Sequence, residues 1–207
     1  MKKTKAPGQA ISVADVQMRR VIVTIAGPRL LTCKVSDKML DQLEATQTGK
    51  AKGPREKRNP EAEFRAACHV VDEKRGVYGI PSIAIEKAMV VAGGRILDMQ
   101  MTKLRGSIQV VPEHPSGLLP IEAKAPRMRR DFVRFKNTAS IAYRPEFVNW
   151  KVRVTIQFVP AVTSLEQVLT ILRIAGSSIG IGSWRPEHSG SFGRFEIVGP
   201  VEEVRVG

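Results

Sequence analysis

The sequence contains few cysteines and no long apolar run. Its two cysteines, Cys33 and Cys68, do not form a C-x-x-C pair, and both stand among apolar residues. We therefore expect small buried thiols rather than a disulfide or metal ligands, as is typical of a reducing cytoplasm. No apolar run approaches the roughly 20 residues that a membrane-spanning helix needs, and no apolar signal-peptide core follows the basic start. We expect a soluble cytoplasmic protein.

Acidic and aromatic residues are also scarce. The 207 residues include 33 Lys and Arg against 20 Asp and Glu, which gives a formal net charge of +13, and only 5% of the residues are aromatic. This excess of positive charge predicts a polyanionic partner, with nucleic acid ahead of an anionic membrane surface. A basic protein without such a partner is the alternative. Because rings are few, we expect electrostatics to outweigh base stacking, with weak sequence preference and strong salt dependence.

The usual motifs of catalysis and cofactor binding are missing. The histidines His69, His114 and His188 are scattered without the spacing of a metal site. The glycine-rich stretch 176–198, GSSIGIGSWRPEHSGSFGRFEIV, contains no Lys. It follows an expected helix, whereas a phosphate-binding loop precedes one. We expect no nucleotide, metal or other cofactor and no catalytic residue. The alternative is a metal-independent endoribonuclease with His188 as general acid or base.

Apolar periodicity predicts an α+β fold. The clearest strand is 150–158, in which apolar residues alternate with polar ones as in a half-exposed antiparallel strand. Strand 19–27 is expected to stop at Gly27-Pro28 and to pair with 30–35 as a hairpin. A buried helix is expected at 81–94. This order predicts a ferredoxin-like or RRM-like antiparallel sheet with packed helices.

The expected organisation is one domain with mobile basic segments. We expect a flexible basic arm over 1–18 and a single α+β RNA-binding domain over 19–207. Two ferredoxin-like halves, at about 19–111 and 119–207, are the alternative arrangement. Segment 46–60 has no apolar periodicity and is expected to be a mobile basic loop.

Basic side chains concentrate in four places that are candidate nucleic-acid contacts. They are the loop 46–60, the segment 127–136, the polar side of strand 150–158 and the glycine-rich stretch. In 127–136 the arginines surround Phe132, and the segment is expected to form a projecting hairpin. The predicted nucleic-acid-binding residues are Lys50, Lys52, Arg55, Lys57, Arg58, Arg127, Arg129, Arg130, Arg134, Lys136, Lys151, Arg153, Gly180, Gly182, Trp184, Arg185 and Arg194.

Structural roles remain open for two of these residues. Trp184 could equally be a core or hinge aromatic, and Arg185 could pair with Glu187 or Glu196.

The C-terminal sequence GIGSWRPEHSGSFGRFEIV resembles the signature of a family of phage-encoded proteins, in which a G-x-G-x-W-R-P segment precedes a G-R-F strand. The segments GIPSIAIEKAMVVAG and RPEFVNWKVRVTIQF resemble that family too, so the likeness runs from about Phe64 onward. A phage origin would place the protein in the cytoplasm of a host cell.

The order of helix, glycine-rich loop and strand also resembles the RAMP superfamily, which supplies RNA-binding backbone subunits and RNA-processing proteins of CRISPR effectors. This resemblance implies that Gly180, Gly182, Gly190 and Gly193 lie against RNA. It also implies that 127–136 is a protruding thumb-like hairpin, and that copies associate head to tail along the strand.

Together these features favour a non-catalytic protein that binds single-stranded nucleic acid, RNA ahead of DNA, largely without sequence preference. Two alternatives come from other classes. One is a phage interaction or inhibitor protein that binds an acidic protein, and the other is the metal-independent endoribonuclease.

Overall fold

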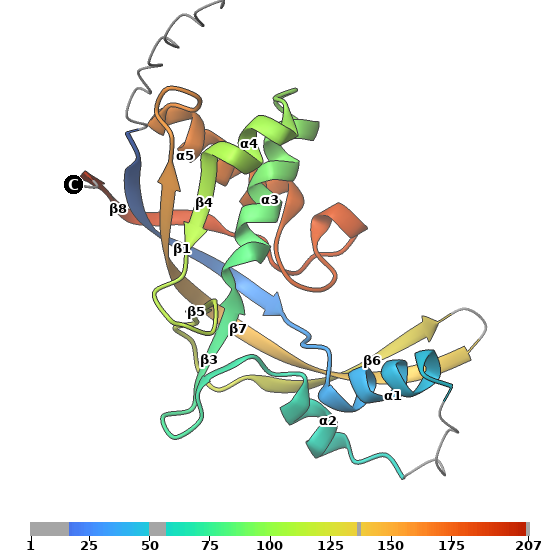
Figure 1. Cartoon of the computed structure of the whole chain (residues 1–207). Helices are drawn as coiled ribbons and strands as arrows, with labels where there is room; N and C mark the ends of the chain where they lie inside the picture. Colours follow the sequence, from blue (N-terminus) through green and yellow to red (C-terminus); the bar gives the residue numbers. More distant parts are fainter. Residues whose placement is uncertain (1–16, 50–56, 136–137, 206–207) are drawn as a thin grey trace, which may run out of the picture.

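A computed structural model describes residues 17–49, 57–135 and 138–205 (Figure 1). Several predicted features lie outside these ranges, namely nearly all of the arm 1–18 and the side chains of Lys50, Lys52, Arg55 and Lys136.

The main sheet has the strand order β4-β7-β1-β8, and each neighbouring pair is antiparallel. Its strands are β1 (Arg19–Leu31), β4 (Ile108–Val111), β7 (Thr138–Phe158) and β8 (Glu196–Arg205). Helix α3 (Ser82–Arg95) comes between β1 and β4 in the chain, and α5 (Leu165–Ile174) comes between β7 and β8. This β-α-β-β-α-β order with interleaved strands is ferredoxin-like, so the predicted fold class is confirmed.

Strands from the two predicted halves alternate within this one sheet. β1 and β4 belong to 19–111, whereas β7 and β8 belong to 119–207. The halves therefore do not form two ferredoxin-like units, because β1 pairs with β7 and β8 and β4 pairs with β7, each across the two halves.

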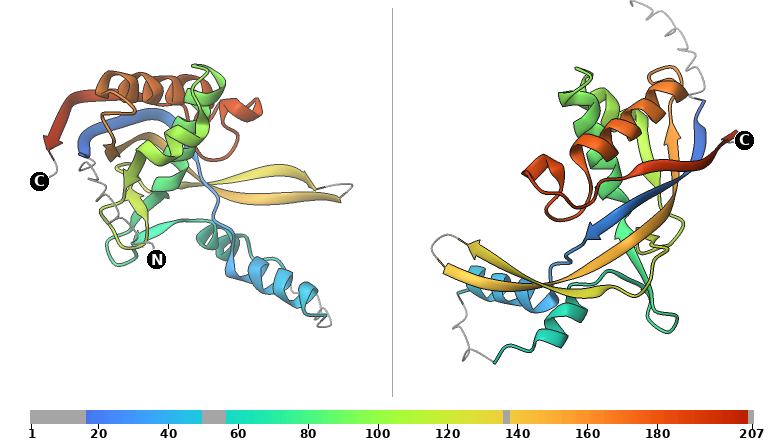
Figure 2. Two further views of the ribbon diagram at one scale, coloured as in Figure 1. Left: turned by 45° about the horizontal axis from the view of Figure 1, so that its top comes forward. Right: turned by 180° about the vertical axis from the view of Figure 1, so that it is seen from behind.

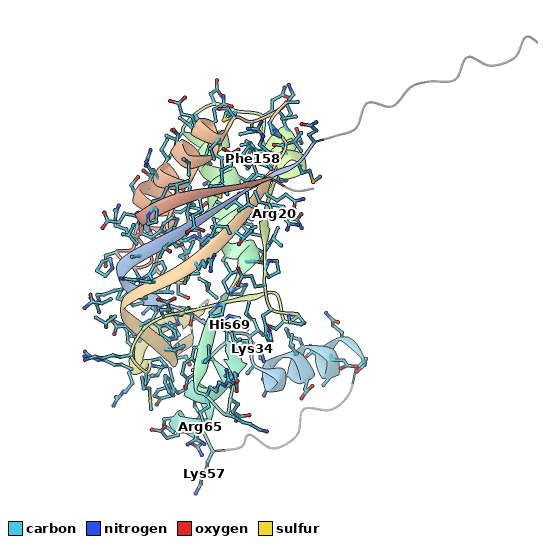
Figure 3. The ribbon with its side chains drawn as sticks, turned by 90° about the vertical axis from the view of Figure 1, so that its left-hand side faces the viewer. Arg20, Lys34, Lys57, Arg65, His69 and Phe158 are labelled. Carbon is cyan, nitrogen blue, oxygen red and sulfur yellow. The ribbon has the colours of Figure 1, made fainter. Side chains whose placement is uncertain are left out.

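One face of the main sheet is apolar and is covered by helices α3 and α5. Alternate residues of the two central strands point into this core, where each buried side chain contributes about 1.5–3 kcal/mol. They are Val21, Val23, Ile25, Val152, Val154 and Ile156. From the helices, Ile85 and Met89 of α3 and Ile171 of α5 complete the core. The opposite face is open, and Figure 3 looks onto the strands from that side, with Arg20 labelled.

Two insertions add further elements to the ferredoxin-like unit. The first, between β1 and α3, holds α1 (Asp37–Gln47), α2 (Pro60–Ala66), β2 (Val70–Asp72) and β3 (Val77–Pro81). The second, between β4 and β7, holds β5 (Leu118–Pro120) and β6 (Arg127–Phe135). β2, β3 and β5 form a small second sheet, and α4 (Met101–Ser107) leads from α3 into β4.

Strand β6 and the first half of β7 form the predicted basic hairpin. They pair from Arg127↔Glu146 to Phe135↔Thr138, whereas β1 pairs with β7 only from Glu146 onward. The hairpin therefore extends beyond the main sheet, as the left view of Figure 2 shows. Helix α1 extends from the same end of the molecule.

The predicted stop of the first strand at Gly27-Pro28 is wrong. β1 continues through both residues to Leu31, with Gly27 opposite Trp150 and Arg29 opposite Val148. Pro28, which has no backbone N–H, falls opposite Asn149, where a φ of 51° already interrupts the regular strand. The chain then leaves the sheet for α1, so 30–35 does not form the expected hairpin partner.

The two cysteines differ in their surroundings. Cys68 is buried after α2, where its Sγ donates to the carbonyl oxygen of Phe64 at 3.3 Å. Burial raises the pKa of this thiol to about 11. Cys33 is exposed, so the expectation that it is buried is wrong. Its position follows from the departure of the chain from the sheet after Leu31.

We predict that only Cys33 reacts quickly with a thiol reagent at pH 8. With a pKa of about 11, only about one Cys68 thiol in a thousand is ionised at that pH, and burial also excludes the reagent. Native protein should release one equivalent of chromophore in a fast phase, and unfolded protein should release two. The variant Cys33→Ser should lack the fast phase, and equal rates for both thiols in the native wild type would contradict the prediction.

Candidate nucleic-acid interface

The hairpin has one face that combines arginines with an exposed ring. Residues opposite each other in the pairing share a face, so Arg130, Phe132 and Arg134 lie with Tyr143 and Ile141. We call this the Phe132 face. Phe132 is 65% exposed, and Ile141 is 38% exposed. No ion pair in the described ranges involves Arg130 or Arg134, so their charges face solvent without compensation.

The other hairpin face contacts the glycine-rich stretch. Arg129 Nε lies 2.6 Å from Asp131 Oδ1, and Arg144 NH1 lies 3.7 Å from Asp131 Oδ2. The guanidinium groups of Arg129 and Arg144 lie 5.5 and 5.7 Å from the centre of the Trp184 ring. We call this the Trp184 face. It brings together Arg129 and Trp184, which are far apart in the sequence.

Phe192 continues the same cluster beneath Trp184. The two rings meet edge to face at 6.3 Å, and Arg129 and Arg29 lie 4.9 and 4.4 Å from the Phe192 ring centre. Arg29 also pairs with Glu146 at 2.6 Å. Sequence reasoning missed Arg29, Arg144 and Phe192 as members of this cluster. Their spacing carries no signal, because β1, β7 and the loop meet only through the sheet topology.

The glycine-rich stretch packs against the protein itself. After α5 the chain forms a π-helical turn (Ala175–Ile179), and it later forms a short 3-10 helix (Pro186–His188). The loop is fastened to the end of β1, since Ser183 N donates to the Leu31 oxygen at 2.7 Å and Gly193 N donates to the Arg29 oxygen at 2.8 Å.

The close approaches at its glycines are also internal. A Cβ at Gly193, where φ is +70°, would stand 1.7 Å from the Ile181 oxygen, and one at Gly190 would stand 1.7 Å from the Trp184 oxygen. At Gly180 and Gly182 the nearest atoms are likewise protein atoms. Internal packing thus accounts for these glycines, and their contact with RNA stays a prediction.

Arg185 and Arg194 are engaged within the loop. Arg185 donates to Glu187 from Nε at 3.0 Å and from NH2 at 2.7 Å, which is one of the two pairings expected from the sequence. Burial raises the pKa of Glu187, but the Arg185 hydrogen bond and the charges of Arg185, His188 and Arg95 outweigh it and hold that pKa below its ordinary value. Arg194 donates to the carbonyl oxygen of Ser177. Both arginine side chains therefore already make hydrogen bonds within the loop.

The remaining predicted residues are spread over the molecule. Lys151 and Arg153 lie on the open face of the main sheet, where Arg153 stands 3.9 Å from Glu202. Where Arg20–Ala26 of β1 pairs with Lys151–Gln157 of β7, the residues on that face include no aromatic side chain, so this part of the sheet lacks the stacking rings of an RRM. Lys57 is exposed, whereas Arg58 pairs with Glu63, donates to the Ile141 oxygen at 2.7 Å and lies 5.5 Å from the Tyr143 ring centre. Figure 3 shows Lys57 at the α2 end of the molecule.

Other kinds of site find little support in the described ranges. No group of three or more His, Cys, Asp or Glu side chains in them could hold a metal ion. Among the described helices, none is both long and apolar enough to cross a membrane. His188 is exposed, with its Nε2 3.8 Å from Glu187 Oε2.

Comparison with known proteins gives distant structural likenesses only. No protein-family model and no curated protein matches the chain, so the phage-family resemblance stays a prediction. The chain is similar to a chain in the cryo-EM structure of the type III-B Cmr-beta bound to cognate target RNA, with 13% identity and a TM-score of 0.46. The likeness covers 91% of this chain and 61% of that chain, so this chain spans less than two thirds of its neighbour's length. The fold assignment rests on the strand order and not on this likeness.

We predict that Gly193→Ala destabilises the protein by about 2 kcal/mol or more, because the new Cβ meets a backbone oxygen in a left-handed conformation. The matched control is Gly106→Ala, since a Cβ at Gly106 in helix α4 meets nothing within 4 Å. That change should stabilise the helix by about 0.4–1 kcal/mol. Urea unfolding measures both variants, and equal midpoints would show that the loop does not depend on this close approach.

Proposed function

We propose that the chain is a non-catalytic protein that binds single-stranded nucleic acid, with RNA favoured over DNA. The observation that carries the proposal is the Phe132 face of the hairpin. There, an exposed ring lies between two arginines that have no acidic partner in the described ranges. Cationic side chains bind phosphates, and an exposed ring offers a stacking surface to an unpaired base.

The arrangement of charges favours a single strand over a duplex. The arginines and the ring lie on a narrow projecting hairpin, and an aromatic ring stacks only on a base that is already unstacked. Every base has a π-face and every nucleotide has a phosphate, so binding of this kind has weak sequence preference. The preference for RNA over DNA rests on the resemblance to the RAMP superfamily.

Assembly along the strand is the second part of the proposal. A head-to-tail contact joins two different surfaces of the same chain and generates open filaments when its rotation does not close. The hairpin and helix α1 extend from the body and offer such surfaces (Figure 2). Side chains exposed on α1 include Met39, Leu40 and Leu43.

Two other functions predict different results with the same purified protein. An interaction protein would retain its acidic protein partner in a pull-down after nuclease treatment. An endoribonuclease would cleave labelled RNA in the presence of a chelator, and His188→Ala would abolish the cleavage.

We predict that Arg130→Ala/Arg134→Ala weakens the binding of a single-stranded oligoribonucleotide by on the order of tenfold at moderate salt. With about six phosphate contacts, the wild-type slope of log K against log salt should be about −4, and the loss of two contacts should reduce its magnitude by about 1.4.

The control for this prediction is Arg105→Ala/Arg173→Ala. It removes the same charge from helices α4 and α5, where both arginines are exposed and belong to no ion pair in the described ranges. Fluorescence anisotropy measures both slopes. If the two double variants weaken binding equally, net charge rather than the hairpin determines binding.

We further predict that long single-stranded RNA converts the protein into larger assemblies, whereas an oligonucleotide that fits one copy does not. Light scattering with and without RNA measures the change. A strict monomer under all conditions would contradict assembly but leave binding by a single copy intact.

A further inference from the structure

Trp184 is exposed although the loop around it is packed. Trp184 is 39% exposed, whereas Phe192 and Phe195 of the same loop are only 4% and 6% exposed. Its backbone has a φ of 51°, which is uncommon for a bulky residue and costs free energy. The Trp184 carbonyl oxygen accepts from Phe192 N at 3.0 Å, so the internal hydrogen bonding of the loop accounts for the backbone conformation, whereas burial in the core does not account for the exposed ring.

The residues around the Trp184 ring contact it directly and carry a net positive charge. Arg129 and Arg144 lie 5.5 and 5.7 Å from its centre. Asp131, whose side chain is 2% exposed, accepts a hydrogen bond from Arg129 at 2.6 Å and forms a longer ion pair of 3.7 Å with Arg144. Across this cluster, Arg29, Arg129 and Arg144 face the two carboxylates of Asp131 and Glu146. The net charge around the ring is therefore positive.

We propose that Trp184 stacks an unpaired base of single-stranded RNA, as a contact separate from the Phe132 face. The inference rests on the proposed function and names a specific base contact for it. Arg129 and Arg144 are both engaged in ion pairs with Asp131, whereas Trp184 is 39% exposed, so the indole is the part of this cluster that is open to a ligand. The ring stays 39% exposed although two guanidinium groups lie over it, and an exposed π-surface in a positive surrounding charge matches a base that is attached to phosphates.

The edges of the hairpin indicate how one strand reaches both rings. The Trp184 face and the Phe132 face are opposite sides of the same hairpin, so a strand that contacts both crosses one of its edges. On the β7 edge, Arg58 donates to the Ile141 oxygen at 2.7 Å. β6 pairs only with β7 in the described ranges, so its other edge is unpaired. We therefore expect the nucleic-acid strand to pass from one face of the hairpin to the other over the β6 edge.

Intrinsic fluorescence tests the inference directly. The chain has two tryptophans, and Trp150 is fully buried at 0% exposure, so quenching by a ligand at the surface reports Trp184. The probes are a single-stranded oligoribonucleotide, an abasic phosphodiester chain of the same length, and heparin. We expect quenching by the oligoribonucleotide and little or none by the two probes without bases, although all three bind the basic surface. Fluorescence anisotropy with labelled probes measures that binding separately.

Variants at Trp184 extend the test to affinity. Trp184→Leu should weaken binding of the oligoribonucleotide by about fivefold or more and should weaken binding of the abasic chain little. Trp184→Phe keeps an aromatic ring and should restore much of the affinity. Urea unfolding shows whether each variant is folded. If a variant does not fold, protection of the wild-type fluorescence from acrylamide, a neutral quencher, by bound RNA but not by the bound abasic chain still decides the question.

The outcomes separate the inference from the proposed function. Binding of the oligoribonucleotide with no more quenching than the abasic chain produces would overturn stacking on Trp184 and leave RNA binding intact. Absence of binding to the oligoribonucleotide at low salt would overturn both.

Discussion

Strand β7 belongs to the main sheet and to the hairpin at the same time, and the other features of the interface depend on this continuity. Glu146 pairs with Leu31 of β1 and with Arg127 of β6, so it marks the point where one pairing gives way to the other. Beyond it, Val152, Val154 and Ile156 are anchored in the core. The hairpin is therefore a continuation of a strand that is anchored in the core, and the position of its arginines depends on that anchoring.

The basic residues behind the formal net charge of +13 fall into two groups, those that pair with a carboxylate and those that have no acidic partner in the described ranges. Arg29, Arg58, Arg129 and Arg185 pair with carboxylates, and two of these four pairs, those of Arg29 and Arg129, lie where the hairpin meets β1 and the glycine-rich loop. Arg130 and Arg134 have no such partner in the described ranges. A basic composition alone does not distinguish these two groups, although only the second has its full charge available to a polyanion.

The sequence predicted the features that depend on local periodicity. Alternation in 150–158 identified the central strand, and the arginine-rich segment 127–136 was expected to project as a hairpin. It did not predict that β1 continues through Pro28, because the regular pairing is interrupted opposite this residue by Asn149, 121 positions later in the chain. It also missed Arg29 and Arg144 beside the loop. These contacts arise from strand order, which has no signature in the spacing of the residues.

Arg58 also has a consequence for the behaviour of the protein at high concentration. By donating to the Ile141 oxygen, it occupies an acceptor on the edge of β7 where a strand from another molecule would otherwise pair. On β4 of the main sheet, the Glu86 carboxylate occupies a backbone donor instead, because it accepts from Val110 N at 3.1 Å. Unpaired strand edges are templates for aggregation, and here side chains from neighbouring segments block two of them.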